Sequence, residues 1–160
     1  MALKALRKYD EGTDIAHVVR ALPSGVTYLE RGCVMIIDTN YTGTGKVGDG
    51  NNVVAVPTGT SGSPVGVLLN DVEDIDLSTQ PHLNRFYKDV VPLCSPVTLL
   101  THGYVYTDKL VTGNTPAAGG AAHFNTDGKF TTTTTSTRVG TFRGAKDADG
   151  FVGVDVNIRV

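Results

Sequence analysis

The chain has 160 residues and a formal net charge of −2 at pH 7. That length suits one domain with a sizeable core, or two small lobes. No dense stretch of Lys and Arg is present, which argues against a nucleic-acid partner, because phosphate binding needs a basic face. The apolar runs hold about five residues, whereas a membrane-spanning helix needs roughly twenty, so we expect no membrane segment.

Val and Thr are the most frequent residues, and 19 Gly and 7 Pro interrupt them. Branching at Cβ restricts rotamers in a helix but suits a pleated strand. Glycine supplies the positive-φ positions that tight turns require. The composition therefore predicts an all-β fold, a small β-barrel or sandwich-like domain built from short strands.

Residues 1–25 differ from the rest, because their apolar side chains are spread among charges and Pro23-Ser24-Gly25 ends the segment. We expect an N-terminal arm that packs on a neighbouring subunit; a first strand or helix of the same domain is the alternative. The segment lacks the apolar core of an export signal, so synthesis in a cytoplasm is expected. The predicted anchors of the arm, and hence the predicted partner contacts, are Leu3, Leu6, Tyr9, Ile15 and Val18.

A β-rich domain is expected over residues 26–160, with an irregular connection at 77–96 between sub-units 26–76 and 97–160. Residues 39–52, dense in Gly, Thr and Asn, predict a surface loop. The predicted strands, in chain order, are Val26–Leu29, Cys33–Asp38, Val53–Val56, Val65–Asp71, Val97–Thr101, Tyr104–Thr107, Ala121–Asn125, Phe130–Thr135 and Phe151–Val160.

Local patterns refine this division. Asp-Gly pairs predict tight turns at Asp127-Gly128 and Asp149-Gly150. The run Thr131–Ser136 predicts an exposed strand, since threonine hydroxyls form cross-strand pairs. A Val-Gly-x-apolar pattern occurs at Val65-Gly66 and again at Val139-Gly140, which suggests two related β units; chance similarity is the alternative. Glycine inside a strand also predicts a bulge or a close backbone contact.

The segment Gly59-Thr60-Ser61-Gly62-Ser63-Pro64 resembles the nucleophile segment of chymotrypsin-fold proteases, in which a serine attacks beside an oxyanion hole. In that fold a whole barrel precedes the serine, which is far more chain than precedes Ser61. The preceding histidine, His17, lies in the predicted arm. We therefore interpret the segment as a turn before Val65.

Other motifs for chemistry are incomplete. Gly43-Thr44-Gly45-Lys46 lacks both ends of a phosphate-binding loop, and residues 146–150 lack the full ligand set of a calcium loop. The 4 His residues show no metal-binding spacing. Cys33 and Cys94 lie far apart and predict two buried thiols. We therefore expect no catalytic residue, no cofactor and no metal.

Four stretches together resemble the cement, or decoration, proteins of tailed-bacteriophage capsids, and the likeness covers most of the chain from about Gly32. The order of glycine, strand, Thr-rich strand, Val-Gly-x-apolar, Asp-Gly turn and apolar strand is similar to small β-barrel decoration domains. The four stretches are Ser63–Asp76, Val97–Val105, Pro116–Phe124, and Val139–Phe142 followed by Lys146–Val152.

The resemblance implies a non-enzymatic virion protein on the capsid exterior, made in the host cytoplasm. It implies that the protein binds the major capsid protein, clamps neighbouring copies of it, and forms a homotrimer or another small cyclic homo-oligomer. The main alternative is another virion β protein of the tail tube, neck or fibre, because all of these favour Thr/Gly-rich strands. A carbohydrate- or ligand-binding module is a further alternative, although the chain has no Trp and only 5 Phe and 6 Tyr for an aromatic platform.

Overall fold

The computed structural model describes residues 3–4, 13–40, 53–74 and 90–158, and the regular structure in these residues is entirely β-strand. The predicted all-β fold is therefore confirmed. The strands are β1 (Leu3–Lys4), β2 (Thr13–Val19), β3 (Tyr28–Leu29), β4 (Val34–Ile37), β5 (Val53–Ala55), β6 (Pro64–Leu68), β7 (Asp71–Glu73), β8 (Val90–Pro92), β9 (Pro96–Leu100), β10 (His102–Thr107), β11 (Ala121–Phe124), β12 (Phe130–Thr131), β13 (Gly140–Phe142) and β14 (Val152–Asn157).

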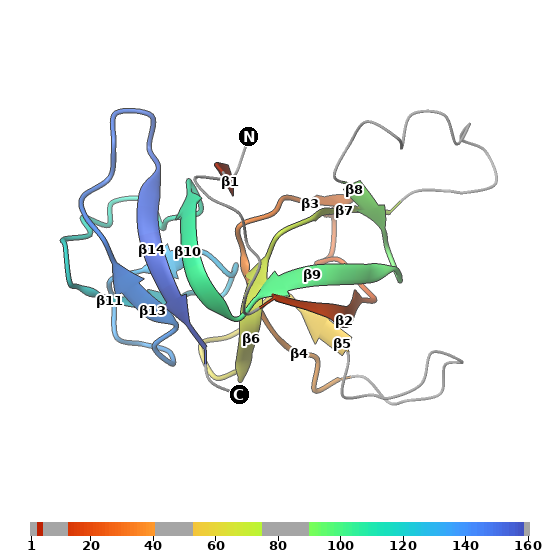
Figure 1. Cartoon of the computed structure of the whole chain (residues 1–160). Coiled ribbons are helices and arrows are strands. Elements are labelled where there is room, and N and C mark those ends of the chain that lie inside the picture. The colour runs from red at the N-terminus through yellow and green to blue at the C-terminus, as the bar shows by residue number, and fades with distance from the viewer. Residues whose placement is uncertain (1–2, 5–12, 41–52, 75–89, 159–160) are drawn as a thin grey trace.

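Five of these strands close into a barrel in the order β2-β5-β4-β6-β9 (Figure 1). Strand β2 runs parallel to β5, with Val18 opposite Val53, and antiparallel to β9, with Val18 opposite Pro96. The register between β2 and β9 shifts between Asp14 and His17. Such an irregularity bends a strand and increases its twist, which helps a small barrel to close.

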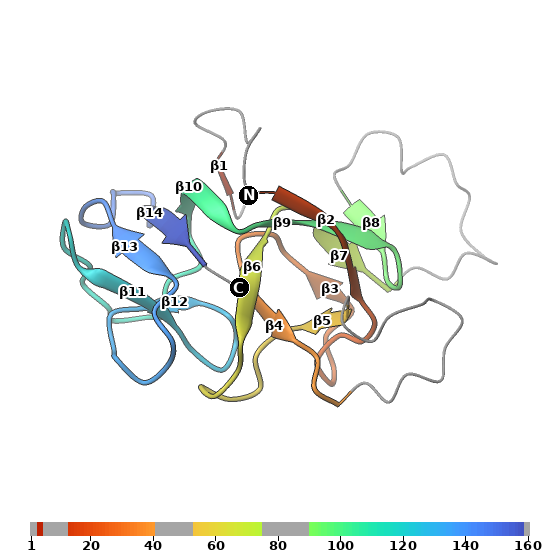
Figure 2. The same ribbon diagram turned by 60° about the horizontal axis from the view of Figure 1, so that its bottom comes forward.

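The other strands form two open sheets. One has the order β1-β10-β14-β13-β11-β12, and its longest pairing joins β10 to β14 from His102 opposite Asn157 to Thr107 opposite Val152. The second sheet has the order β3-β7-β8. In Figures 1 and 2 the six-stranded sheet lies on one side of β6, and the rest of the barrel with the three-stranded sheet lies on the other.

Strands β4 and β6 contribute to two hydrophobic cores at once. Val34 and Val67 are fully buried against the six-stranded sheet, whereas their neighbours Met35 and Leu68 are fully buried inside the barrel. Successive side chains leave a strand on opposite faces, so a strand covered on both faces is apolar throughout. The continuous apolar runs in the sequence therefore correspond to a wall shared by the barrel and the sheet.

The two glycines of the repeated Val-Gly pattern both lie where backbone or side chains approach closely. A Cβ atom on Gly66 would lie 2.8 Å from Leu99 Cβ, and one on Gly140 would collide with the carbonyl oxygen of Asp155. The predicted close contacts are confirmed. They allow β6 to pack against β9, and β13 against β14, without an intervening side chain.

Both predicted Asp-Gly turns are confirmed. Gly128 has a φ of +71° in the tight turn that joins β11 to β12, and its amide donates to the Asn125 carbonyl at 3.1 Å. Gly150 has a φ of +91°, and its amide donates to the Asp147 carbonyl at 3.1 Å. Glycine suits both positions because other residues rarely adopt a left-handed conformation.

The prediction of a strand over Thr131–Ser136 is wrong beyond Thr131. The residues from Thr132 to Thr135 are exposed as expected, but they form a loop after β12. The side chain of Asn114 accepts hydrogen bonds from the Thr132 amide at 2.8 Å and from the Thr131 hydroxyl at 3.1 Å. The Asn114 side chain thus accepts the hydrogen bond that the Thr132 amide would donate to a neighbouring strand if β12 were longer.

The two cysteines are both free, and they differ in environment. Cys33 is buried as predicted, whereas Cys94 is exposed, so the second prediction is wrong. Cys94 lies in the turn that follows β8, where its φ is +64°, and turns run over the surface of a protein. No helix of the described residues is long and apolar enough to span a membrane.

Several boundary predictions concern residues that the structure describes only in part. The predicted loop at 39–52 and the irregular connection at 77–96 lie largely outside the described residues, although β8 falls within the connection. The division into an arm at 1–25 and a domain at 26–160, with sub-units 26–76 and 97–160, stays a prediction.

Candidate functional site

The structure places the predicted partner contacts at separate points. Leu3 lies in β1, at the edge of the six-stranded sheet beside β10. Ile15 and Val18 lie in the barrel strand β2, where Val18 is 5% exposed. Leu6 and Tyr9 lie outside the described residues. Their role as partner contacts therefore stays a prediction.

The protease-like segment is a bend that leads into β6, as interpreted from the sequence. Ser61 is exposed, and a Cβ atom on Gly62 would lie 2.8 Å from Ile36 Cδ1. The glycine therefore has a packing reason to be there, because the segment runs directly over β4. Within the part of the chain that the structure describes, no three His, Cys, Asp or Glu side chains are placed to hold a metal ion.

A groove of about 650 Å³ lies where the barrel meets the six-stranded sheet. One wall comes from the segment that leads into β3, including Pro23 and Val26. A second wall comes from Val56 and Pro57, which follow β5, and a third from Lys109 and the β11–β12 turn. The groove is therefore formed by segments that are far apart in the sequence, and it exists only when all of them pack together.

Two apolar side chains of this groove are open to solvent. Val26 and Tyr28 are each 40% exposed and are the exposed large hydrophobic residues among the described positions. Isolated exposed apolar residues are common, but two that share one concave surface indicate a binding surface. We therefore take this groove as the candidate functional site.

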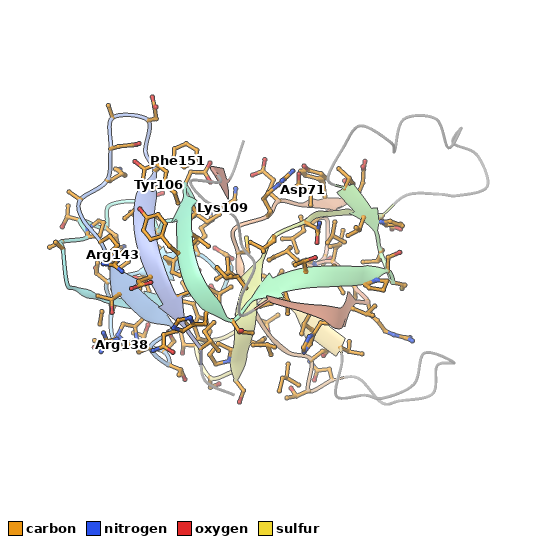
Figure 3. The ribbon with its side chains drawn as sticks, in the orientation of Figure 1. Asp71, Tyr106, Lys109, Arg138, Arg143 and Phe151 are labelled. Atoms are coloured by element: carbon orange, nitrogen blue, oxygen red, sulfur yellow. The ribbon has the colours of Figure 1, made fainter. Side chains whose placement is uncertain are left out.

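An ion pair holds β3 in place beneath the groove. The side chain of Arg31 contacts both carboxylate oxygens of Asp71, with Nη2 to Oδ2 at 3.1 Å and Nε to Oδ1 at 3.3 Å. The Arg31 amide also donates to Asp71 Oδ1 at 2.7 Å. Figure 3 shows Asp71 at the end of the barrel that carries the three-stranded sheet. This arrangement is a bidentate pair that fixes the chain direction just after β3.

The titration of Asp71 and Tyr28 reflects this contact. Burial alone would raise the pKa of Asp71, but hydrogen bonds from Arg31 and from Tyr28 lower it below its ordinary value. Burial and the hydrogen bond to Asp71 raise the pKa of Tyr28 to about 12. The Tyr28 hydroxyl therefore stays protonated and donates to the Asp71 carboxylate throughout the physiological range.

We expect the Arg31–Asp71 pair to contribute to acid stability. Because the pKa of Asp71 is lower in the folded state, its contribution is present above the unfolded value of about 3.9 and is lost as pH falls through the folded pKa. Asp71→Asn should reduce the free energy of unfolding at pH 7 by about 2 kcal/mol and flatten its decline below pH ~4. Urea denaturation between pH 2.5 and 7 measures this; an unchanged acid limb in Asp71→Asn would contradict the assignment.

A second ion pair joins two parts of the molecule at the groove: the barrel with the three-stranded sheet, and the six-stranded sheet. We call these parts the two lobes. Lys109, which follows β10, contacts the carboxylate of Glu30, which lies between β3 and β4. Burial alone would lower the pKa of Lys109, but the contact with Glu30 raises it. Lys109 also lies 3.8 Å from Asp108 Oδ1. The groove therefore has a charged bridge along one side, with its cation shared between two carboxylates.

The outward face of the six-stranded sheet carries a separate polar and aromatic surface. The Tyr106 hydroxyl donates to Asp147 at 2.5 Å, and the Tyr106 ring stacks on Phe151 with 5.7 Å between ring centres (Figure 3). Arg143 Nη2 contacts Asp155 Oδ2 at 2.6 Å on the same sheet. These contacts are local within the lobe and fix the β13–β14 connection to β10.

Sequence reasoning did not identify the groove residues Val26 and Tyr28. Their alternation with Thr27 predicts a strand with one apolar face, which normally means a buried face. Nothing in the local pattern shows that this face would stay open, since that depends on how residues 56–58 and 126–129 pack around it. A short apolar strand directly after Pro23-Ser24-Gly25 is the available signal.

The comparisons with known proteins give one family. The family model described as structural cement protein (E217 gp24/Pam3 gp6), a family of phage proteins, matches residues 24–157. The matched range includes β3 to β14, and thus most of both cores and all of the groove lining except Pro23. No individual curated protein matches the chain significantly. Because the match spans most of the sequence, this chain belongs to the phage structural cement protein family.

Proposed function

We propose that this protein binds the outside of a phage capsid and clamps neighbouring major capsid proteins together, acting without catalysis. The match to the structural cement family over residues 24–157 carries the proposal. The shared wall of β4 and β6 supports it, because two lobes joined through common strands form a stiff body that can transmit load between two contacts.

A clamp of this kind gains strength from valency. We propose a cyclic homo-oligomer, a trimer, in which each subunit engages one or more capsid proteins. Several modest contacts made at once raise the effective affinity by about a hundredfold or more, as long as the geometry lets them form together. The N-terminal residues are proposed to cross to a neighbouring subunit, with Leu3, Leu6, Tyr9, Ile15 and Val18 as anchors.

Particle composition tests the proposal first. We expect hundreds of copies of this chain in each purified particle, in a simple ratio to the major capsid protein, measured by calibrated gel densitometry. Particles produced without the chain should release their DNA at a lower temperature, because fewer contacts oppose the internal pressure. Adding back purified protein should restore the release temperature.

The same measurements separate the alternatives. A few to some dozens of copies per particle would place the chain in the tail, neck or fibre and refute the capsid role. A capsid-level copy number without any change in release temperature would mean that the chain decorates the shell without clamping it. Deletion of residues 1–12, with oligomerisation and capsid binding both intact, would refute the proposed contacts of Leu3, Leu6 and Tyr9.

A further inference from the structure

We infer that the groove beside β3 binds an extended segment of the major capsid protein as an added β-strand, and that this segment has apolar residues flanked by Lys or Arg. The inference rests on the proposed capsid role and specifies its docking surface. Three observations point to this partner: a strand edge that no strand of the described residues pairs with, exposed apolar side chains along it, and an excess of negative charge around it.

The open edge follows from the register of β3. Strand β3 lies at the edge of the sheet β3-β7-β8, and Tyr28 is opposite Glu73 of β7. The Asp74 amide donates to the Thr27 carbonyl at 3.0 Å, so Thr27 and Asp74 form a hydrogen-bonded pair. In an antiparallel ladder the next residue then points its amide and carbonyl the other way. The backbone groups of Tyr28 therefore face away from β7, as an added strand requires.

The groove runs along this edge. Tyr28 and Leu29 leave the strand on opposite faces, yet both line the groove together with Val26. Val26 and Tyr28 keep 40% of their surface exposed at its mouth. An extended peptide can thus pair with the backbone of β3 and bury its own apolar side chains against these residues. This combination provides affinity from the backbone and selectivity from the side chains.

Charge selects a basic partner. The charged side chains that line the groove itself balance, because two carboxylates face two lysines. The excess of carboxylates comes from residues of β7, from Asp74 and from Asp108 beside the groove, and Lys109 is shared between Glu30 and Asp108. An acidic peptide would add like charge, whereas Lys or Arg beside the apolar residues would find opposite charge. The carboxylates are Glu30, Asp71, Glu73, Asp74, Asp108 and Asp127, and the cations are Arg31, Lys109 and Lys129.

The test measures binding to empty shells assembled from the major capsid protein of the same phage. We expect the variant Val26→Ser/Tyr28→Ser to bind at least about tenfold more weakly than the parent protein. Asp127→Lys should bind several-fold more weakly, with less dependence on salt. Asp149→Lys, in the turn before β14, is the matched charge control and should bind as the parent does. Thermal unfolding of each variant verifies that the fold is retained.

Hydrogen exchange supplies a second readout that is independent of substitution. The Tyr28 amide should exchange quickly in the free protein and at least about tenfold more slowly on the shells, because an added strand accepts its hydrogen bond. Parental binding by Val26→Ser/Tyr28→Ser, or unprotected Tyr28 on saturated shells, would overturn the inference while leaving the capsid role intact. Failure of the parent protein to bind shells at all would instead refute the capsid role.

Discussion

Gly140→Val is expected to lower the free energy of unfolding by about 3 kcal/mol or more, the upper range for overpacking a well-packed region. A Cβ atom at this position would overlap the backbone carbonyl of Asp155 and lie 3.2 Å from Val156 Cα. The colliding atoms belong to the neighbouring strand β14 and have no rotamer to change. The strands must separate or the β13–β14 ladder must break, so thermal and urea denaturation should both show a large loss.

Gly144→Val is the matched control for this substitution. Gly144 lies just after β13, and a Cβ atom there would meet nothing within 4 Å. The free energy of unfolding of this variant should change by less than about 1 kcal/mol. A slight gain is expected if the added side chain reduces the conformational freedom of the unfolded chain. Equal losses at both positions would mean that general glycine flexibility, and not the contact between β13 and β14, sets the stability.

Phe124→Ala is expected to cost about 3–5 kcal/mol and to destabilise both lobes together. Phe124 is fully buried in the core of the six-stranded sheet, and that core also contains Val34, Val67 and Leu100 from the barrel strands. Because β4, β6 and β9 line both cores, the sheet cannot unfold without exposing one face of the barrel. We therefore expect a single unfolding transition at a lower temperature in the variant.

Probes in each lobe distinguish this outcome from separate unfolding. Hydrogen exchange at Val154 in the sheet and at Val54 in the barrel should report the same loss of global stability in Phe124→Ala. Val26→Ala, which truncates a side chain that is 40% exposed, should change stability by no more than about 0.5 kcal/mol. Loss of protection at Val154 with unchanged protection at Val54 would show that the two cores are energetically independent.

A stiff body matters for the proposed capsid role. A clamp that joined two contacts through a flexible hinge would let neighbouring capsid proteins move apart at little cost. Here the ion pair between Glu30 and Lys109 and the shared strand wall both connect the lobes beside the groove. A force that pulls on a peptide bound at β3 would therefore be transmitted to the whole molecule and would not be absorbed by one loop.

The fold class could be predicted because it depends on local preferences. Val and Thr favour strands wherever they occur, and the Asp-Gly turns at Gly128 and Gly150 require a left-handed residue whatever surrounds them. The Thr131–Ser136 prediction failed for the opposite reason. Whether a threonine run is a strand depends on a pairing partner, and here Asn114, distant in sequence, binds the Thr132 amide instead.

The sequence by itself determined an all-β protein with tight turns, two close-packed glycine strands and a family resemblance that the match over residues 24–157 confirms. The tertiary structure alone decided which strands close the barrel, that β4 and β6 serve two cores, and that Val26 and Tyr28 remain exposed at the edge of β3. The physical reason is that burial and strand pairing are set by segments far apart in the chain. An apolar strand has the same local pattern whether its second face is covered or open.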